Sequence, residues 1–308
     1  MKKWLVGLLL AGLSLPAAAY REATLPFGVR VQGIENRLAE FGVYARPGEV
    51  LALDLLDVAP ADVGATFDSA PVKTGHGQIN LKMPSTPGTH QVKLTDRRNG
   101  TQMRLNVFVM WQHDGAHGDV LNGYRIGQYP RDPFRGLAVY RRPEAFVEVT
   151  AKNADMRVSP NFTLGQFVCK QGSGFPKYVV LRPQLLQKLE LVLGELNAVN
   201  PDITGLTVMS GYRTPAYNRS LGNGRHSRHL WGGAADVYVD ANGDGIMDDL
   251  NGDGRRDRGD AEWLANFIDA LERTGRFGEH IGGIGTYDSN AHRGPFVHVD
   301  ARGYRARW

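Results

Sequence analysis

The stretch "RHLWGGAAD" (residues 228–236) places a histidine and an aspartate seven positions apart, with small residues and one tryptophan between them. The glycines and alanines allow the backbone to turn back closely between the two side chains. Asp236 stands near the start of the alternating run "ADVYVD" (235–240), which is typical of a strand. The spacing alone fits two readings: His229 and Asp236 share one metal ion, or they are a surface histidine and an unrelated strand carboxylate.

A third ligand would have to come from another part of the chain, because a catalytic zinc site uses three protein ligands and one open position. His298 in "FVHVD" (296–300) is the best candidate, since a histidine in a short apolar strand faces either a core or a site. If the two strands are neighbours, Asp236 and His298 can project from the same face. A hydrogen-bonded structural histidine is the ordinary alternative.

Length and composition indicate two modest domains behind an export signal. The chain has 308 residues and is 42% hydrophobic, which is enough for two cores. In residues 1–19, Lys2 and Lys3 precede an apolar run too short to span a membrane, and a small-residue cleavage site follows. Without these lysines the net charge of +4 falls by two, which is too weak to indicate nucleic acid binding. We expect a periplasmic or secreted protein with no stable membrane anchor after cleavage.

Residues 20–110 have the pattern of an all-β sandwich, which we expect to be immunoglobulin-like. Segment 101–110, "TQMRLNVFVM", alternates apolar and polar side chains as a half-buried strand does. Segments 47–57 and 86–96 each place Pro-Gly before an extended run, a turn followed by a strand. Turn signals about every eight to twelve residues favour a sandwich. Residues 111–150 are rich in Gly, Pro, Arg and aromatic residues and are predicted to be a connector lying over the second domain.

Residues 151–308 are predicted to form an α+β domain with a small antiparallel sheet. Segment 181–199 places leucine and valine side chains on one helical face, with Pro183 in the first turn. A second amphipathic helix is expected over 260–275, with Asp260 as its N-cap. Further strands are expected at residues 204–210 and 281–287.

Three blocks of this second region carry a family resemblance, which also includes a fourth segment near its start. The three blocks are "SGYRTPAYNR" (210–219), "SRHLWGGAAD" (227–236) and "GGIGTY" followed by "FVHVDARGYRARW" (282–308), and the additional segment is "VSPNFTLGQFVC" (158–169). In this order they resemble the zinc D-Ala-D-Ala metallopeptidases of peptidoglycan, a superfamily of carboxypeptidases, dipeptidases and murein endopeptidases whose fold hedgehog proteins share. The likeness covers roughly residues 155–308, and the three blocks are specific together although each is weak alone.

The resemblance implies a site and a chemistry. His229, Asp236 and His298 correspond to the His, Asp and His zinc ligands, and Arg213 to an arginine that holds the substrate or its developing oxyanion. Zinc would lower the pKa of its bound water to ~7 and polarise the scissile carbonyl. A structural salt bridge beside a turn is the alternative for Arg213. The expected partners are peptidoglycan stem peptides, cut at a terminal D-Ala or at a crosslink.

At the expected position of the general base, this sequence departs from the better-known members of the family. These often carry Glu or Asp three residues before the last histidine, and commonly a His-x-His pair, where this chain has Pro295 and Phe296. The remaining candidates are Asp288, His292 and Asp300. His292 is slightly favoured, whereas Asp300 lies two residues along the strand from the last histidine and could equally orient it.

An acidic segment at residues 240–260 predicts a second, structural metal. Hard oxygen ligands at alternate positions of a glycine-containing loop suit calcium and not zinc. Neither of two overlapping registers ends in the Glu of an EF-hand, so the segment is closer to the short aspartate-rich repeats of extracellular calcium modules. A solvated acidic hairpin without a metal is the alternative. The predicted calcium ligands are Asp240, Asn242, Asp244, Asp248, Asp249, Asn251, Asp253, Asp257 and Asp260.

Two other classes of function stay open at this point. The missing Glu and His-x-His pair leave room for a catalytically inactive module that binds peptidoglycan or a protein. A calcium-dependent adhesion protein would instead use the sandwich of residues 20–110 as its working part.

Overall fold

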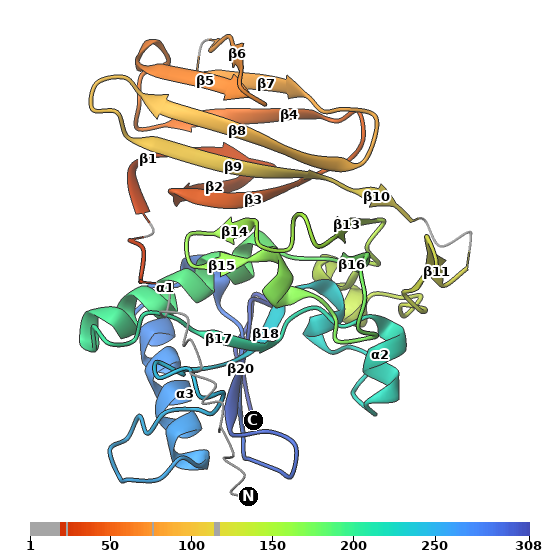
Figure 1. The fold of residues 1–308 in the computed structure, drawn as a ribbon, viewed down its shortest axis with the longest axis vertical. Coiled ribbons are helices and arrows are strands. Elements are labelled where there is room, and N and C mark those ends of the chain that lie inside the picture. The colour runs from red at the N-terminus through yellow and green to blue at the C-terminus, as the bar shows by residue number, and fades with distance from the viewer. Residues whose placement is uncertain (1–18, 23, 76, 114–117) are drawn as a thin grey trace, which may run out of the picture.

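The computed structural model describes residues 19–22, 24–75, 77–113 and 118–308, so the predicted export signal lies outside the described residues apart from its last position. The described chain is mostly β, with few helices and several small sheets (Figure 1). Within these ranges, no helix is long and apolar enough to cross a membrane.

Residues 24–109 form two β-sheets around a common hydrophobic core. One sheet has the strand order β2-β1-β4-β7 and the other the order β3-β9-β8-β5-β6. The pairs are antiparallel except β3 with β9, which run parallel. Two facing sheets fit the predicted sandwich, and an immunoglobulin-like topology stays a prediction. The strands are β1 (Thr24–Val31), β2 (Ile34–Leu38), β3 (Glu40–Ala45), β4 (Val50–Leu56), β5 (Val63–Phe67), β6 (Ala70–Val72), β7 (Gln78–Lys82), β8 (Gly88–Asp96) and β9 (Gln102–Val109), with the 3-10 turn η1 (Pro60–Asp62).

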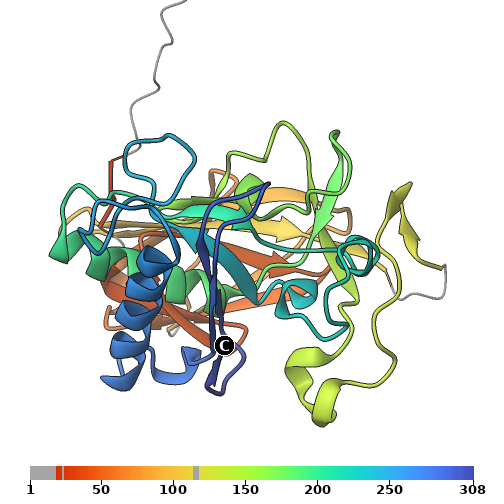
Figure 2. The same ribbon diagram turned by 90° about the horizontal axis from the view of Figure 1, so that it is seen from below.

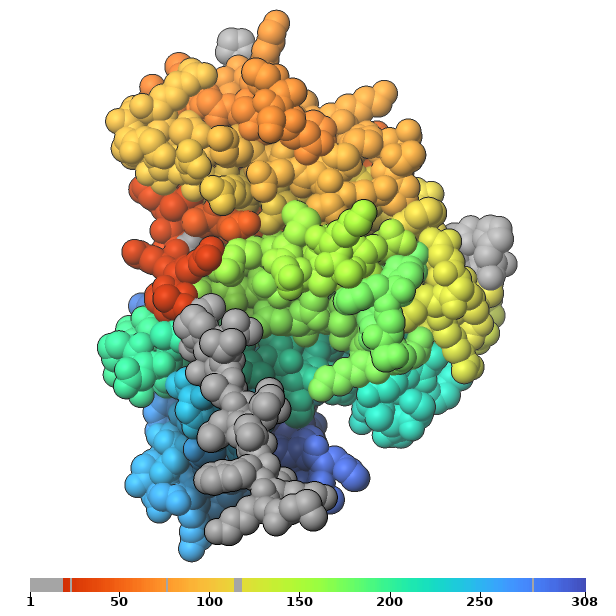
Figure 3. Space-filling view, viewed as in Figure 1, coloured from red at the N-terminus to blue at the C-terminus, as the bar shows by residue number. Residues whose placement is uncertain are grey.

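Strand β9 is buried on more than the face that its sequence predicts. Met103, Leu105 and Val107 lie in the sandwich core as the alternation indicates. On the opposite face, however, Asn106 and Phe108 are also buried, because this side of the sheet meets the second region. The Asn106 side chain donates to the carbonyl of Arg157 at 2.8 Å. Figure 3 shows the sandwich lying directly against the second region. The polar position therefore marks an internal contact surface and not a solvated face.

The segment between the two regions contains short strands and 3-10 turns. A small sheet with the order β10-β13-β16 joins it to the second region, so this sheet crosses the boundary predicted at residue 150. Its elements and those that follow are β10 (Trp111–Gln112), β11 (Val120–Leu121), β12 (Tyr124–Arg125), η2 (Phe134–Gly136), η3 (Ala138–Tyr140), β13 (Ala145–Val149), β14 (Arg157–Ser159), β15 (Phe162–Thr163), η4 (Leu164–Phe167) and β16 (Lys177–Val179).

The second region is built on a sheet with the order β17-β18-β20-β19-β21. Its pairs are antiparallel, as predicted, except that β21 runs parallel to β19. Helix α3 packs against β19 and β20, and lies beside them in both ribbon views (Figures 1 and 2). The elements are α1 (Pro183–Val199), β17 (Thr207–Ser210), α2 (Pro215–Ser220), η5 (Arg228–Trp231), β18 (Ala234–Tyr238), α3 (Arg258–Arg273), η6 (Gly278–His280), β19 (Gly283–Tyr287), β20 (Phe296–Asp300) and β21 (Ala306–Arg307).

The two long helices form where the hydrophobic periodicity places them. Helix α1 begins at Pro183 and buries its predicted leucine and valine face. Helix α3 begins two residues earlier than expected, and its N-cap is Asp257 and not Asp260. Asp260 is the third residue of the helix and accepts the backbone N–H of Asp257 at 2.9 Å, which completes a capping box. The prediction of Asp260 as the cap was wrong because either acidic residue satisfies the sequence rule.

Candidate metal centre

Two neighbouring strands place Asp236 and His298 side by side. Strands β18 and β20 are paired, and Asp236 stands directly opposite His298 in their register. Opposed residues of paired strands project from the same face, so both side chains point toward the same side of the sheet. The arrangement predicted for these two residues, on the condition that their strands are neighbours, is the one that forms.

A tight turn before β18 brings in His229. This residue lies in η5, and the chain then reverses at Gly232, which has a left-handed backbone with φ of 62°. A Cβ on Gly232 would lie 2.0 Å from the carbonyl oxygen of Val180, so the turn has no room for a side chain. The glycine thus fixes the path that returns His229 to the strand carrying Asp236.

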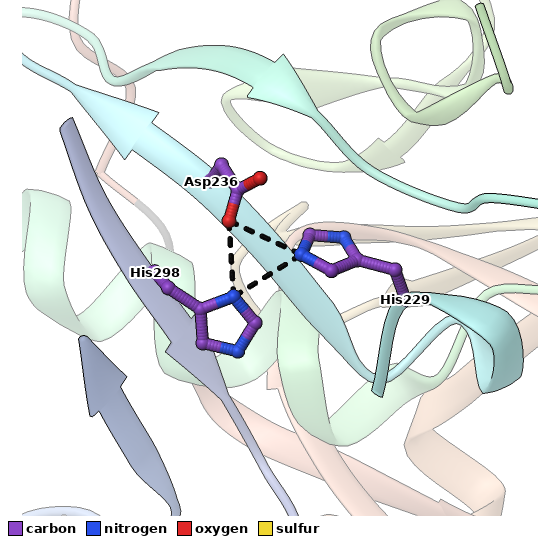
Figure 4. Close-up of side chains that lie close together, drawn as sticks. All are labelled: His229, Asp236 and His298. Carbon is purple, nitrogen blue, oxygen red and sulfur yellow. Dashed lines mark hydrogen bonds and ion pairs between the residues drawn. The ribbon is translucent and has the colours of Figure 1, made fainter. Parts of the chain in front are cut away.

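The three side chains converge on one point (Figure 4). The Nε2 atom of His229 lies 3.1 Å from Oδ1 of Asp236 and 3.1 Å from Nδ1 of His298, and the latter two atoms are 2.9 Å apart. All three residues are buried, with exposed fractions of 1%, 2% and 6%. Across the described chain, this is the one group of three His, Cys, Asp or Glu side chains whose potential ligand atoms lie within 4.8 Å of one another.

Hydrogen bonds on the far sides of the two rings determine which nitrogens face the centre. The Nδ1–H of His229 donates to the carbonyl of Gly211 at 2.6 Å, and the Nε2–H of His298 donates to Asp300 at 3.1 Å. Both protons then point outward, and each ring presents a lone pair inward. With these tautomers, two nitrogen lone pairs and a carboxylate oxygen face each other, an arrangement that a metal cation between them would stabilise.

The spacing of these atoms fits zinc. Tetrahedral zinc holds nitrogen and oxygen ligands at ~2.0–2.2 Å, which sets neighbouring ligand atoms ~3.3 Å apart. The separations of 2.9–3.1 Å are close to that value, and the two histidines and one carboxylate are a common catalytic donor set. Three protein ligands leave one position for water or substrate.

Asp300 lies behind His298, on the side of the ring away from the centre. Its carboxylate is completely buried and also accepts the backbone N–H of Gly283 at 2.9 Å and the guanidinium of Arg302. Burial alone would raise the pKa of Asp300, but the hydrogen bonds from His298 and Arg302 outweigh it and hold the pKa well below its usual range. A buried anion in this position orients the histidine, and it does not touch the open side of the centre.

Arg213 binds the other oxygen of Asp236. Its guanidinium forms an ion pair with Oδ2 of Asp236, and its Nε donates to the hydroxyl of Ser210 at 2.9 Å. Burial would raise the pKa of the Asp236 carboxyl, but the two neighbouring imidazoles outweigh burial when they are protonated, and the pKa then lies far below its usual range. Arg213 therefore holds the carboxylate in place, and it also lines the cavity in front of it.

A cavity of about 920 Å³ opens onto the centre. His292 lies in its wall, on the loop between β19 and β20, together with Trp308. On another side the wall contains Gly245 and Met247, which belong to the acidic segment. The hydroxyl of Tyr238 donates to the carbonyl of Gly245 at 3.2 Å and ties this segment to the end of β18. The acidic segment is thus part of the cavity that gives access to the centre.

Comparison with protein families connects this site to a known class. A family profile, Peptidase M15, matches residues 160–249, which contain His229 and Asp236 but end before His298. This match supports the assignment of the C-terminal region to the M15 peptidase superfamily. Comparison with curated proteins and with solved structures gives no match. M15 peptidases are zinc-dependent, and the buried His-Asp-His group is where this M15 region could bind the ion.

The predicted calcium ligands lie in two similar loops beside the centre formed by His229, Asp236 and His298. In the first loop Asp240 accepts the backbone N–H groups of Asp244 and Gly245, at 3.0 and 2.9 Å. In the second loop Asp249 accepts those of the corresponding residues, at 3.2 and 2.8 Å. The last two predicted ligands, Asp257 and Asp260, instead cap α3. These carboxylates bind their own backbone and do not converge, so the structure gives no support to calcium, which stays a prediction.

Several residues around the M15 centre are absent from the sequence prediction. Arg302 forms an ion pair with Asp300. The ring of Trp308 lies 5.2 Å from that of His298 between centroids, and its Nε1–H donates to the hydroxyl of Tyr287 at 2.7 Å. The spacing of Arg302, two residues after Asp300, is a signal that could have found it. Trp308 follows a short irregular stretch, and nothing in its neighbourhood indicates that β21 returns it to the site.

Proposed function

We propose that this protein is an exported zinc metallopeptidase that hydrolyses peptidoglycan stem peptides, either at a terminal D-Ala or at a crosslink. The observation that carries the proposal is the convergence of two imidazole lone pairs and a carboxylate oxygen at the end of an open cavity. Membership of the M15 superfamily supports the class of reaction. The periplasm, or the exterior of the cell, is the proposed compartment, because that is where peptidoglycan lies.

The residues around the centre have different proposed roles. His229, Asp236 and His298 would hold zinc, which supplies an activated water and a polarised carbonyl when bound. Asp300 fixes the ring of His298 from behind. Arg213 fixes Asp236, and its place in the cavity wall allows it to pair with the developing oxyanion or with a substrate carboxylate. His292, also in the wall, is the proposed proton acceptor.

An inactive binding module is the alternative, and metal-dependent hydrolysis separates the two. We expect purified protein to contain about one zinc ion per chain and to cleave purified muropeptides. Treatment with a strong zinc chelator should abolish cleavage, and added zinc should restore it. Elemental analysis and chromatography of the digests measure both. Stoichiometric zinc with no cleavage of any muropeptide would support the binding module instead.

Calcium binding by the acidic segment belongs to the proposal as a separate, structural prediction. If calcium binds the loops at 240–260, a calcium-selective chelator should lower the melting temperature by several degrees, because a ligand stabilises only the folded state. Asp249→Asn should remove this difference, whereas Asp62→Asn in the sandwich should preserve it. An unchanged melting curve of the wild-type protein in chelator would contradict the prediction.

A further inference from the structure

A second cavity adjoins the one that opens onto the metal centre. It has a volume of about 390 Å³, and Asn223 and His226 line both cavities. The ring of His226 packs 4.7 Å from that of Phe134 between centroids, so the shared wall is held by the segment between the two regions. The two cavities therefore share one wall, formed by Asn223 and His226.

Positive charge collects in this second cavity. Arg131, Arg219 and Arg225 line it and are exposed, and Asp132 is the acidic residue among the lining side chains. In the part of the chain that the structure describes, none of the three arginines forms an ion pair. The charges come from different segments, since Arg131 precedes η2, Arg219 lies in α2 and Arg225 follows it. Three unpaired guanidinium groups brought together by folding favour an anionic ligand.

A buried acceptor in the same cavity also lacks a partner. Asn218 lines the cavity and is 2% exposed. Its amide nitrogen donates to the carbonyls of Asn223 and Gly224, at 3.3 and 3.1 Å, which assigns the orientation of the amide group. Among the described atoms its Oδ1 has no hydrogen-bond partner. A buried acceptor without a donor is costly, and a ligand N–H group would satisfy it.

We propose that this second cavity is a subsite for a peptide arm that carries free carboxylates, and that Arg219 and Arg225 determine specificity for it. The proposal rests on the proposed peptidase function, because the arm belongs to the peptide whose bond lies at the metal centre. Carboxylates of the arm pair with the arginines, and a backbone N–H of the arm donates to Asn218. The two adjoining cavities then select a branched or crosslinked acidic peptide that occupies both at once.

Two forms of one substrate test the subsite. One is a crosslinked muropeptide dimer with free carboxylates, and the other is the same dimer with those groups converted to carboxamides. In the zinc-loaded wild-type protein we expect a lower KM for the carboxylate form. In Arg219→Gln/Arg225→Gln, the KM for the carboxylate form should rise about 10-fold relative to the KM for the carboxamide form. This change corresponds to the loss of two exposed ion pairs. Arg104→Gln/Arg255→Gln removes as many charges from exposed positions outside both cavities and should leave the ratio unchanged.

Binding to the metal-free protein separates this proposal from the peptidase function. Calorimetric titration with both dimers should show the same preference and the same loss in Arg219→Gln/Arg225→Gln, without turnover. A wild-type preference that is absent, or an equal loss for both dimers, would overturn the subsite. If the preference is present but the zinc-loaded protein hydrolyses neither dimer, the subsite stands and the proposed peptidase function fails.

Discussion

Replacing His298 with alanine is expected to lower zinc affinity by roughly 100- to 1,000-fold and to abolish measurable peptidase activity. Apparent binding free energies of about 10–16 kcal/mol for structural zinc sites correspond to roughly 3–4 kcal/mol for each ligand. His298 also lies between two buried carboxylates, Asp236 and Asp300, and the substitution removes the Nε2–H that Asp300 accepts. The measurements are zinc content after dialysis against a graded series of zinc buffers, and hydrolysis of muropeptides.

The controls for this prediction come from the same chain. His90 pairs with Asp68 in the sandwich at 2.7 Å, so His90→Ala removes a histidine–carboxylate pair remote from the centre and should leave zinc content unchanged. Asp236→Asn preserves the shape of the Asp236 side chain and should also lower zinc affinity. A loss of zinc affinity in both variants would show that misfolding of His298→Ala alone is not the cause. A His298→Ala protein that retains zinc and activity, with a normal melting curve, would refute the proposed centre.

The second large effect is expected at Asp300, which does not face the cavity. Asp300→Asn should lower zinc affinity or activity by about 10- to 100-fold, the usual cost of losing the carboxylate that orients a histidine ligand. The reason is that the carboxylate accepts the Nε2–H of His298 and so keeps its Nδ1 lone pair directed at the centre. A protein assayed with saturating zinc should recover part of the loss if orientation of the ligand is the cause.

A closely matched control exists in the sandwich. Asp96 is 1% exposed and is bound by Arg98, two residues later, through the backbone N–H at 3.0 Å and through the guanidinium. Asp300 and Arg302 repeat this arrangement, with the backbone N–H at 3.1 Å. Asp96→Asn should therefore lower stability to a similar degree without any effect on zinc. Equal effects of the two substitutions on zinc affinity would show that Asp300 acts through stability alone.

The sequence predicts the parts of the site that depend on local pattern. The alternation around Asp236 and His298 indicates strands, and the small residues after His229 indicate a close turn; the paired register and the left-handed Gly232 agree with both. Long-range pairing is a different matter, because the alternation that marks a strand does not choose its neighbour. The parallel pairing of β3 with β9, and the return of β21 beside β19, follow from contacts between distant segments and leave no local signal.

Buried polar residues are the other limit of sequence reasoning. Asn106 occupies a strand position where the alternation predicts exposure, and it is buried because another segment accepts its hydrogen bond. Asp257 and Asp260 satisfy a calcium pattern and a helix-capping pattern equally well in sequence, and they act as caps. One residue type thus serves several physical roles, and only the surrounding fold decides among them.

The tryptophan in the cavity wall gives the site an optical signal of its own. Trp308 is 48% exposed, and its ring lies within 5.2 Å of both the His298 ring and the Arg302 guanidinium. Indole fluorescence responds to nearby charge and is quenched by paramagnetic ions, so cobalt loaded in place of zinc should quench the fluorescence of Trp308. The difference between the wild-type spectrum and that of Trp308→Phe then reports occupancy of the site in real time, without any chromophore attached to the substrate.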